Sequence, residues 1–170
     1  VASDPAYNGK PVAQSATSGG FGTNTGSGCP WPVTCFVRSN NGSNNQILLA
    51  GVNGPIQFQW GRFGGNVRCD NAGGVPFLEW TGHDNSTPST MCLELDAVGG
   101  VSRLYSDDPT TVVATGTGPN PAAPPVSFFS MACPGGGVTP MRVAEALVYT
   151  GILTAPQRTA VMQYLTARYT

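Results

Sequence analysis

The chain has 170 residues, of which 23 are Gly and 15 are Pro, and only 10% are charged, against roughly 25% in an ordinary soluble domain. The formal net charge is -1, so the basic surface that neutralises phosphates is missing and we exclude nucleic acid as a partner. No apolar run approaches the roughly 18 residues of a membrane-spanning helix, which excludes membrane insertion. The length of the chain suits one domain over 1–170.

Short apolar or alternating segments recur from residue 33 to residue 131 and predict β-strands. Between them, Gly and Asn supply positive φ and Pro ends strand pairing, so the intervening segments predict turns. Because the strands follow one another without helices, the sequence predicts an all-β antiparallel sandwich or barrel. The predicted strands are 33–38, 46–50, 56–60, 66–69, 77–81, 90–95, 102–106, 111–114 and 126–131.

Alternation within two of these segments predicts which face is buried. In 56–60, Ile56, Phe58 and Trp60 alternate with glutamines, as in a strand with one buried and one solvated face. In 90–95 the same pattern separates two sets of side chains. Met91, Leu93 and Leu95 form the predicted buried face, and Cys92, Glu94 and Asp96 the predicted solvated face.

The last thirty residues predict a strand followed by a helix. Segment 141–149 is apolar on both faces, which predicts a strand that is covered on both sides. Glu145 shares a face with Val143 and Leu147, so we expect it to be partly buried and hydrogen-bonded to a loop backbone. Thr154 to Gln157 form a capping box with Pro in the first turn, and the predicted apolar stripe of the helix is Val161, Tyr164, Leu165 and Arg168. We expect this helix to lie on the sandwich.

This ending also carries a resemblance to a known family. "RVAEALVYTGILTAPQRTAVMQYLTARY" resembles the closing strand, turn and helix of laminin-G-like domains of the concanavalin A-like lectin/glucanase superfamily. "YNGKPV", "PWPVTCFVRS" and "LDAVGGVSRLYSDD" are similar to three of its earlier strands. The resemblance implies a jelly-roll sandwich of two antiparallel sheets. The matching positions of the ending are Glu145, Tyr149, Leu153, Thr154, Gln157, Arg158, Val161, Tyr164 and Leu165.

Two departures from the family pattern lead to further expectations. Family members usually have another strand before the NGKP motif, where this chain begins, so we expect a longer polypeptide or a first strand that a partner supplies. Asp107, Asp108 and Pro109 stand where an Asp-Gly turn is usual, so we expect a turn of a different type.

Candidate catalytic residues are weak, and we predict that the chain is not an enzyme. Glycosidases of the superfamily carry Glu-x-Asp-x-x-Glu on one strand, but here Glu94 and Asp96 lack the third carboxylate. Asp96 precedes Val-Gly-Gly and predicts the start of a hairpin turn. A hydrolytic triad of His83, Asp84 and Ser86 or Ser89 is disfavoured, because these residues share one polar loop without a nucleophile elbow.

Calcium is the one cofactor that the resemblance suggests, because laminin-G-like domains often hold it with loop carboxylates and carbonyls. The available donors are Asp70, beside Asn71, and Asp84, beside Asn85. Each is a single carboxylate next to an amide, which an Asx turn explains better than a calcium site does. We therefore expect no cofactor, with calcium as the alternative.

Carbohydrate binding requires an exposed aromatic ring beside planar polar groups, and the three tryptophans are the candidates. Trp60 shares a face with Phe58 and is predicted to be in the core, whereas Trp31 lies in a loop between prolines and could seal one end of the sandwich. Trp80 is the best candidate for a ring at the rim. The predicted ligand-binding residues are Trp80, His83, Asp84 and Asn85.

The five cysteines leave two interpretations open. Their spacing fits no zinc site, and their odd number permits either disulfides, within or between chains, or buried free thiols. They are Cys29, Cys35, Cys69, Cys92 and Cys133.

Two functions are compatible with these observations. The first is a non-catalytic structural or attachment module that is displayed externally, as a decoration or fibre protein of a virion surface, with other protein subunits as partners. The second is a carbohydrate-binding module of a secreted glycan-active protein, with cell-surface glycan as its partner. Both place the chain outside the cell or on a virion, and glycan binding that depends on Trp80 would favour the second.

Overall fold

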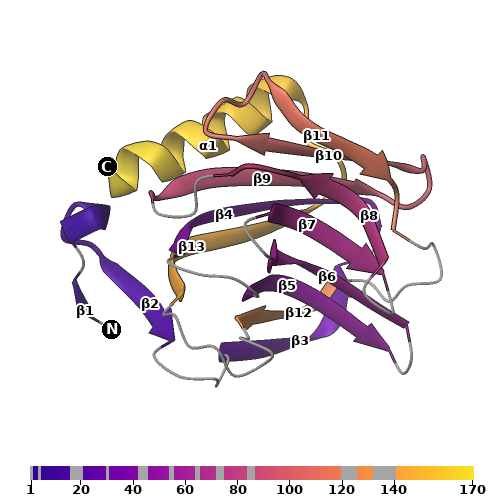
Figure 1. Cartoon of the computed structure of the whole chain (residues 1–170), viewed down its shortest axis with the longest axis horizontal. Helices are drawn as coiled ribbons and strands as arrows, with labels where there is room; N and C mark the ends of the chain where they lie inside the picture. Colours follow the sequence, from indigo (N-terminus) through magenta and orange to yellow (C-terminus); the bar gives the residue numbers. More distant parts are fainter. Residues whose placement is uncertain are drawn as a thin grey trace.

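The computed structural model describes residues 2–3, 5–15, 21–29, 31–41, 46–53, 56–63, 66–71, 75–83, 87–119, 126–131 and 141–170. Side chains are described for 5, 7–11, 31–39, 60–61, 66–70, 75–83, 87–119 and 142–170. The fold is a sandwich of two sheets, with α1 (Ala155–Tyr169) on the outer face of one of them (Figure 1). The described part thus confirms the predicted all-β sandwich with one C-terminal helix.

Every strand pairing that the structure describes is antiparallel. The seven-stranded sheet has the order β1 (Ala2–Ser3), β2 (Pro11–Ser15), β13 (Met141–Thr150), β4 (Val33–Asn41), β9 (Ser89–Asp96), β10 (Val101–Ser106) and β11 (Val112–Thr117). The six-stranded sheet has the order β3 (Phe21–Cys29), β12 (Val126–Met131), β5 (Gln46–Asn53), β6 (Ile56–Phe63), β7 (Asn66–Asn71) and β8 (Val75–Trp80). A short 3-10 helix, η1 (Pro5–Tyr7), lies between β1 and β2.

The main core lies between the two sheets. Trp60 is fully buried there, as predicted from its alternation with the glutamines of β6, and Trp31 and Trp80 pack partly against its edge. Strand β9 contributes alternate side chains to this core, as its pattern predicts. The buried members are Val33, Cys35, Val37, Trp60, Val67, Cys69, Leu78, Met91, Leu93, Leu95, Leu104 and Val143.

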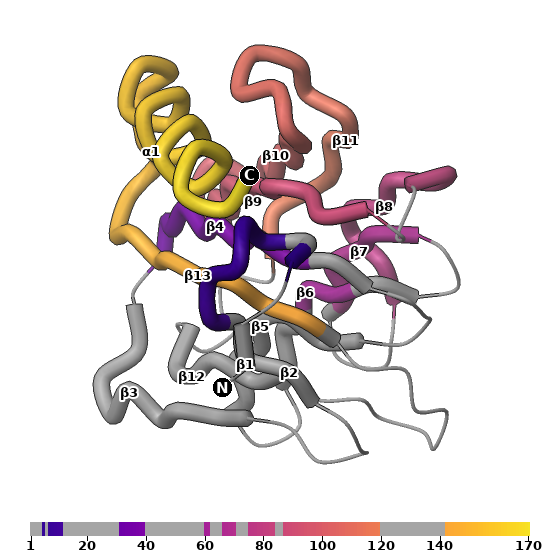
Figure 2. The backbone as a smooth tube through the Cα atoms, turned by 90° about the vertical axis from the view of Figure 1, so that its left-hand side faces the viewer, coloured from indigo at the N-terminus to yellow at the C-terminus, as the bar shows by residue number. Residues whose placement is uncertain are grey.

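A second core lies between the seven-stranded sheet and α1. Figure 2 shows α1 on the outer side of this sheet, across it from β6 and β7. The helix covers the face of β9 that was predicted to be solvated, so Cys92 and Glu94 are buried and that prediction is wrong. The buried members of this core are Tyr7, Phe36, Cys92, Tyr105, Met162, Leu165 and Tyr169.

The helix begins as predicted but presents a different stripe. The capping box is present, with the Thr154 amide donating to Gln157 Oε1 at 3.0 Å. The buried side chains, however, are Arg158, Met162, Leu165 and Tyr169, whereas Tyr164 of the predicted stripe is 44% exposed. The predicted stripe shares only Leu165 with the buried one, because Arg158 is buried against a carboxylate of the sheet.

Strand β13 explains a further error in the predicted faces. Its register against β4 shifts between Val143 and Glu145, which is a β-bulge. Because a bulge inserts one residue, the side chains on either side of it exchange faces. Val143 therefore lies in the inter-sheet core, while Leu147 and Tyr149 pack against the helix cluster.

The remaining sequence predictions concern the turn, the cysteines and the membrane. In the turn after β10, Asp107 has a φ of 57°, and the expected departure from an Asp-Gly turn stays a prediction. Cys69 and Cys92 are buried free thiols, Cys35 is buried as well, and no disulfide joins these three. The side chains of Cys29 and Cys133 lie outside the described residues.

Within the described part, no helix is long and apolar enough to cross a membrane.

Candidate functional site

Two of the predicted ligand-binding residues lie in contact at the end of β8. Trp80 is the last residue of this edge strand, and its ring lies 4.5 Å from the His83 ring, centroid to centroid, at an interplanar angle of 39°. Both side chains are half-buried. The structure thus forms an aromatic pair at the rim of the sandwich, while Asp84 and Asn85 lie outside the described residues.

His83 also lies close to a hydroxyl group. Its Nε2 is 3.3 Å from Ser89 Oγ, which is the serine-histidine pair considered above for a triad. Ser89, however, is buried in β9, so its hydroxyl group cannot reach a substrate carbonyl. Asp84 and Ser86 fall outside the described part. The contact therefore serves to orient the imidazole ring.

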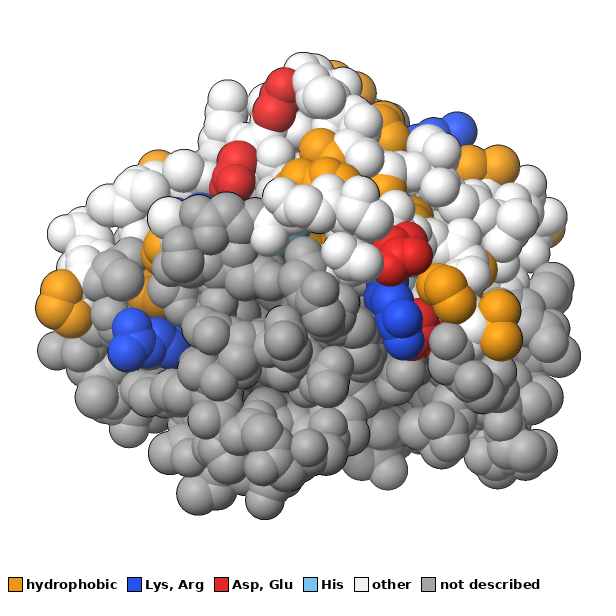
Figure 3. All heavy atoms as spheres, viewed as in Figure 1, with side chains coloured by type: hydrophobic (Ala, Val, Ile, Leu, Met, Phe, Trp, Pro, Cys, Tyr) orange, Lys and Arg blue, Asp and Glu red, His pale blue; other side chains and the backbone are white. Residues whose placement is uncertain are grey.

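The face of β7 and β8 that points away from the core carries planar polar groups. In β7, Val67 and Cys69 point into the core, so Arg68, which lies between them, points to the opposite face of the sheet. Asn66 Nδ2 donates to Glu79 Oε1 at 2.7 Å, and the register pairs Glu79 with Arg68 across the two strands. Figure 3 shows basic and acidic side chains next to one another over β7.

Arg68 forms an ion pair with Asp70, whose side chain is fully buried. Arg68 Nε and Nη2 donate to Asp70 Oδ2 at 3.1 and 3.0 Å, and the Arg68 side chain is 28% exposed. A guanidinium is an unfavourable neighbour for a cation, so Asp70 is poorly suited to the calcium site that was considered for it. The other candidate, Asp84, is not described. Among the described residues, no group of three or more His, Cys, Asp and Glu side chains could hold a metal ion.

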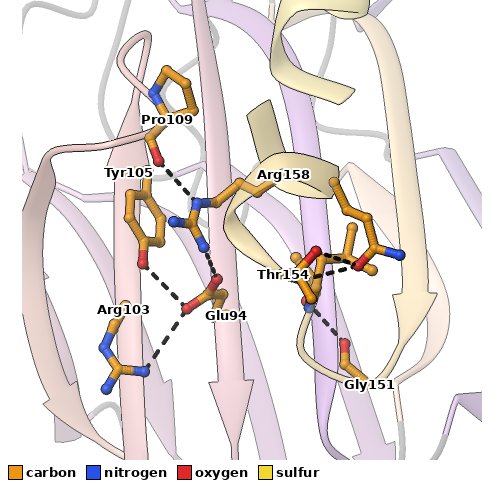
Figure 4. A network of polar contacts seen from close by, with 10 residues as sticks. Glu94, Arg103, Tyr105, Pro109, Gly151, Thr154 and Arg158 are labelled. Atoms are coloured by element: carbon orange, nitrogen blue, oxygen red, sulfur yellow. Dashed lines mark hydrogen bonds and ion pairs between the residues drawn. The ribbon is translucent and has the colours of Figure 1, made fainter. Parts of the chain in front are cut away.

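A second cluster of charged groups lies beneath α1 (Figure 4). Glu94, 2% exposed, accepts a hydrogen bond at 2.5 Å from Arg158 of the helix and one at 3.3 Å from the Tyr105 hydroxyl group. Arg103 lies 3.8 Å from the same carboxylate. Arg158 also donates to the Pro109 carbonyl at 2.9 Å, and its guanidinium lies 4.0 Å from the centre of the Tyr105 ring. This network joins the helix to β9, β10 and the following loop.

The geometry of this network is structural rather than catalytic. Burial, followed by the negative charge of Glu94, raises the pKa of Tyr105, so the hydroxyl group holds its proton more tightly than a nucleophile should. Asp96 begins the hairpin turn as predicted, with Oδ1 accepting from the amides of Val98 at 3.0 Å and Gly99 at 2.6 Å. Glu94 and Asp96 thus bind different parts of the protein itself.

Glu145 is partly buried, as predicted, but its partners differ from the expected loop backbone. It accepts a hydrogen bond from the Tyr169 hydroxyl group at 3.0 Å and lies 3.5 Å from Arg168 Nε, both from the helix. The prediction of a backbone partner is therefore wrong. Glu145 fixes the last turn of α1.

The polar face of β7 was not identified from the sequence. Asn66, Arg68 and Asp70 alternate with core residues, and this period of two was the available signal. Their proximity to Glu79 depends on the pairing of β7 with β8, which the sequence alone does not specify.

Comparison with known proteins supports the fold. No family model and no curated protein matches the chain. Among solved structures, the CBM40 domain of Ruminococcus gnavus IT-sialidase bound to α2,3-sialyllactose is 17% identical to this chain, with a TM-score of 0.64. The superposition covers 90% of this chain and 97% of the CBM40 chain. The receptor-binding domain of the botulinum neurotoxin C/D mosaic serotype is 9% identical, with a TM-score of 0.67 and coverages of 89% and 42%. A Trypanosoma rangeli sialidase is 12% identical, with a TM-score of 0.56 and coverages of 82% and 24%.

These similarities confirm the lectin-like β-sandwich that the resemblance implied. The chain spans nearly the whole CBM40 domain but less than half of the toxin domain and about a quarter of the sialidase. Membership of the laminin-G-like group in particular stays a prediction.

Proposed function

We propose that this chain is a non-catalytic carbohydrate-binding module that binds cell-surface glycan at the end of β8. The observation that carries this proposal is the combination, on a lectin-like sandwich, of the Trp80–His83 aromatic pair with the polar groups of β7 and β8. The proposal also implies an extracellular location, because that is where such a glycan is found.

The chemistry of a sugar requires both kinds of group. An aromatic ring packs against the C–H face of a pyranose, while carboxylate, amide and guanidinium groups form hydrogen bonds with its hydroxyl groups. Trp80 and Glu79 are neighbours on an edge strand, with side chains toward opposite faces of the sheet. A glycan could therefore contact the polar face and extend across the strand end to the aromatic pair.

Sialylated glycans are the first ligands to test. The CBM40 structure contains α2,3-sialyllactose, and a botulinum neurotoxin type C structure of 7% identity concerns interaction with two ganglioside molecules. On this chain, Arg68 could bind a sugar carboxylate, although Asp70 already offsets part of its charge. We therefore propose cell-surface glycan as the ligand class and leave the choice of an acidic or a neutral sugar to the experiment.

The experiment is a glycan array followed by calorimetric titration with α2,3-sialyllactose and with lactose. Trp80→Ala and Glu79→Gln should each weaken binding at least tenfold, which corresponds to about 1.4 kcal/mol. Tyr164→Ala is the matched control, because it removes an exposed aromatic ring from α1, and it should leave the affinity unchanged. Absence of binding to any glycan, or equal binding by all three variants, would refute the proposal.

The passive module of a virion surface, our first hypothesis from the sequence, receives less support. The similar structures reported above are a carbohydrate-binding domain, a toxin receptor-binding domain and sialidases. They favour the second hypothesis. A protein-subunit partner would become the better proposal if the glycan experiment failed and the chain assembled into a symmetric array.

A further inference from the structure

A cleft lies between α1 and the loop that joins β10 to β11. Figures 1 and 2 both show this loop beside the helix, on the outer side of the seven-stranded sheet, whereas β7 and β8 belong to the other sheet. The volume of the cleft is about 380 Å³. The lining residues are Asp107, Pro109, Met162, Gln163, Thr166 and Ala167.

Both walls of this cleft are fixed to the same residue of β9. The Thr90 amide donates to Asp107 Oδ1 at 2.7 Å, and the Asp107 amide donates to the Thr90 carbonyl at 2.8 Å. On the helix side, the hydroxyl groups of Thr90 and Thr166 are 3.1 Å apart. Because both walls are held in place, a ligand would not have to order them on binding.

The cleft presents polar groups that the protein does not use. Asp107 Oδ2 has no hydrogen-bond partner within the described part of the chain, and the Asp107 side chain is 57% exposed. The Gln163 amide is exposed and likewise has no partner among the described residues. Pro109 and Ala167 add apolar surface between these groups, and Met162, which is 1% exposed, closes the floor of the cleft. A carboxylate and an amide beside apolar atoms can bind hydroxyl groups and the C–H face of a sugar together.

The charges around the cleft favour a neutral ligand. The Asp107 carboxylate disfavours an anion. A cation is disfavoured as well, because the guanidinium of Arg38, 5% exposed, lies 3.5 Å from Asp107 Oδ1 and already offsets that charge. The cleft therefore favours an uncharged ligand that carries several hydroxyl groups.

We propose that this cleft is a second carbohydrate site, which takes one neutral pyranose unit. The volume of the cleft lies at the lower end of the roughly 300–1,000 Å³ of ligand pockets, which suits a single sugar ring. The site rests on its own geometry and does not require binding at Trp80. Two sites on one module would allow both to engage a branched or densely glycosylated surface.

The test is an NMR titration of the 15N-labelled chain with neutral and anionic probes. The neutral probes are the methyl glycosides of glucose, galactose, mannose and N-acetylglucosamine, and the anionic probe is the methyl glycoside of N-acetylneuraminic acid. At least one neutral probe should cause saturable shifts of the amides in 107–110 and 162–167. The anionic probe should bind this site at least tenfold more weakly.

Variants separate this site from the surface near Trp80. Gln163→Ala should weaken binding about tenfold, and Ala167→Trp should abolish it by filling the cleft. Ala160→Trp is the matched control, because it places the same ring on an exposed helix position that does not line the cleft. Trp80→Ala should leave the shifts unchanged.

Three results would overturn the proposal. These are the absence of saturable shifts with every neutral probe, shifts that persist in Ala167→Trp, and equal binding of the anionic probe. Because these shifts are measured at α1 and its neighbouring loop, they are independent of success or failure at the end of β8.

Discussion

Removing the Arg158 guanidinium should destabilise the protein strongly, because it leaves Glu94 buried. Arg158→Met keeps the apolar stem of the side chain and removes only its charged end. Breaking a buried ion pair from one side costs roughly 3–5 kcal/mol. Glu94 keeps the Tyr105 hydroxyl group at 3.3 Å and Arg103 at 3.8 Å, so we expect the lower end, about 3 kcal/mol.

Urea denaturation, followed by circular dichroism, measures this loss directly. With a urea dependence of about 2 kcal/mol per M, the midpoint should fall by about 1.5 M. The double variant Glu94→Gln/Arg158→Met should lose at least about 1 kcal/mol less than the sum of the single variants, because it leaves no unpaired charge. Arg168→Met, on the exposed side of the same helix, serves as the control and should leave the urea midpoint nearly unchanged, because exposed ion pairs contribute little to stability.

A small effect would refute this reasoning. If Arg158→Met lowered the free energy of unfolding by less than about 1 kcal/mol, the ion pair would not hold the helix. Strict additivity of the two substitutions would lead to the same conclusion.

Three further predictions concern other parts of the fold. Gly116→Ala would place a Cβ 1.9 Å from a backbone carbonyl oxygen of β8, so it should cost at least about 2 kcal/mol in the same denaturation assay. Hydrogen bonds, first from the Thr111 hydroxyl group and then from the neighbouring threonine, lower the pKa of Asp108 to about 2. Their stabilisation of the turn is therefore complete above the unfolded pKa of about 4 and is lost as the pH falls toward 2, and a 13C NMR titration of the carboxyl group should give a midpoint near 2 rather than 4. Burial raises the pKa of Cys69 and Cys92, so peptide mapping should find both thiols unlabelled by iodoacetamide at pH 8 until the protein is denatured.

The elements that could be predicted from the sequence depend on local patterns. The capping box of Thr154 and Gln157 is a matter of four consecutive residues, and the structure contains it. The alternation around Trp60 and the turn at Asp96 are equally local and were also predicted correctly. The predicted strands likewise follow from short runs of apolar residues between Gly and Pro.

The errors arose where a distant partner decides the structure. Glu94 has the sequence pattern of a solvated residue and is buried only because Arg158, 64 positions later, covers it with a matching charge. The bulge in β13 exchanged the predicted faces, since one extra residue reverses the alternation on one side of it. The buried side of α1 differs from the predicted side because Arg158 is buried. A prediction that considers only apolar residues leaves this arginine out.

The candidate site was predicted in part for the same reason. Trp80 and His83 are three residues apart, so their proximity is local and could be expected. The contribution of Asn66 and Arg68 depends on the register of β7 against β8. That register is a property of the folded sheet.

The close approach at Gly116 has a consequence for how this molecule behaves in concentrated solution. Strands β8 and β11 are the last strands of their respective sheets, and they lie against each other. An unprotected sheet edge can accept a strand from a second molecule and so begin aggregation. Here each terminal strand shields the other, and a side chain at position 116 would separate them. This single glycine thus helps to close the β8 and β11 end of the sandwich against pairing with a strand of another copy.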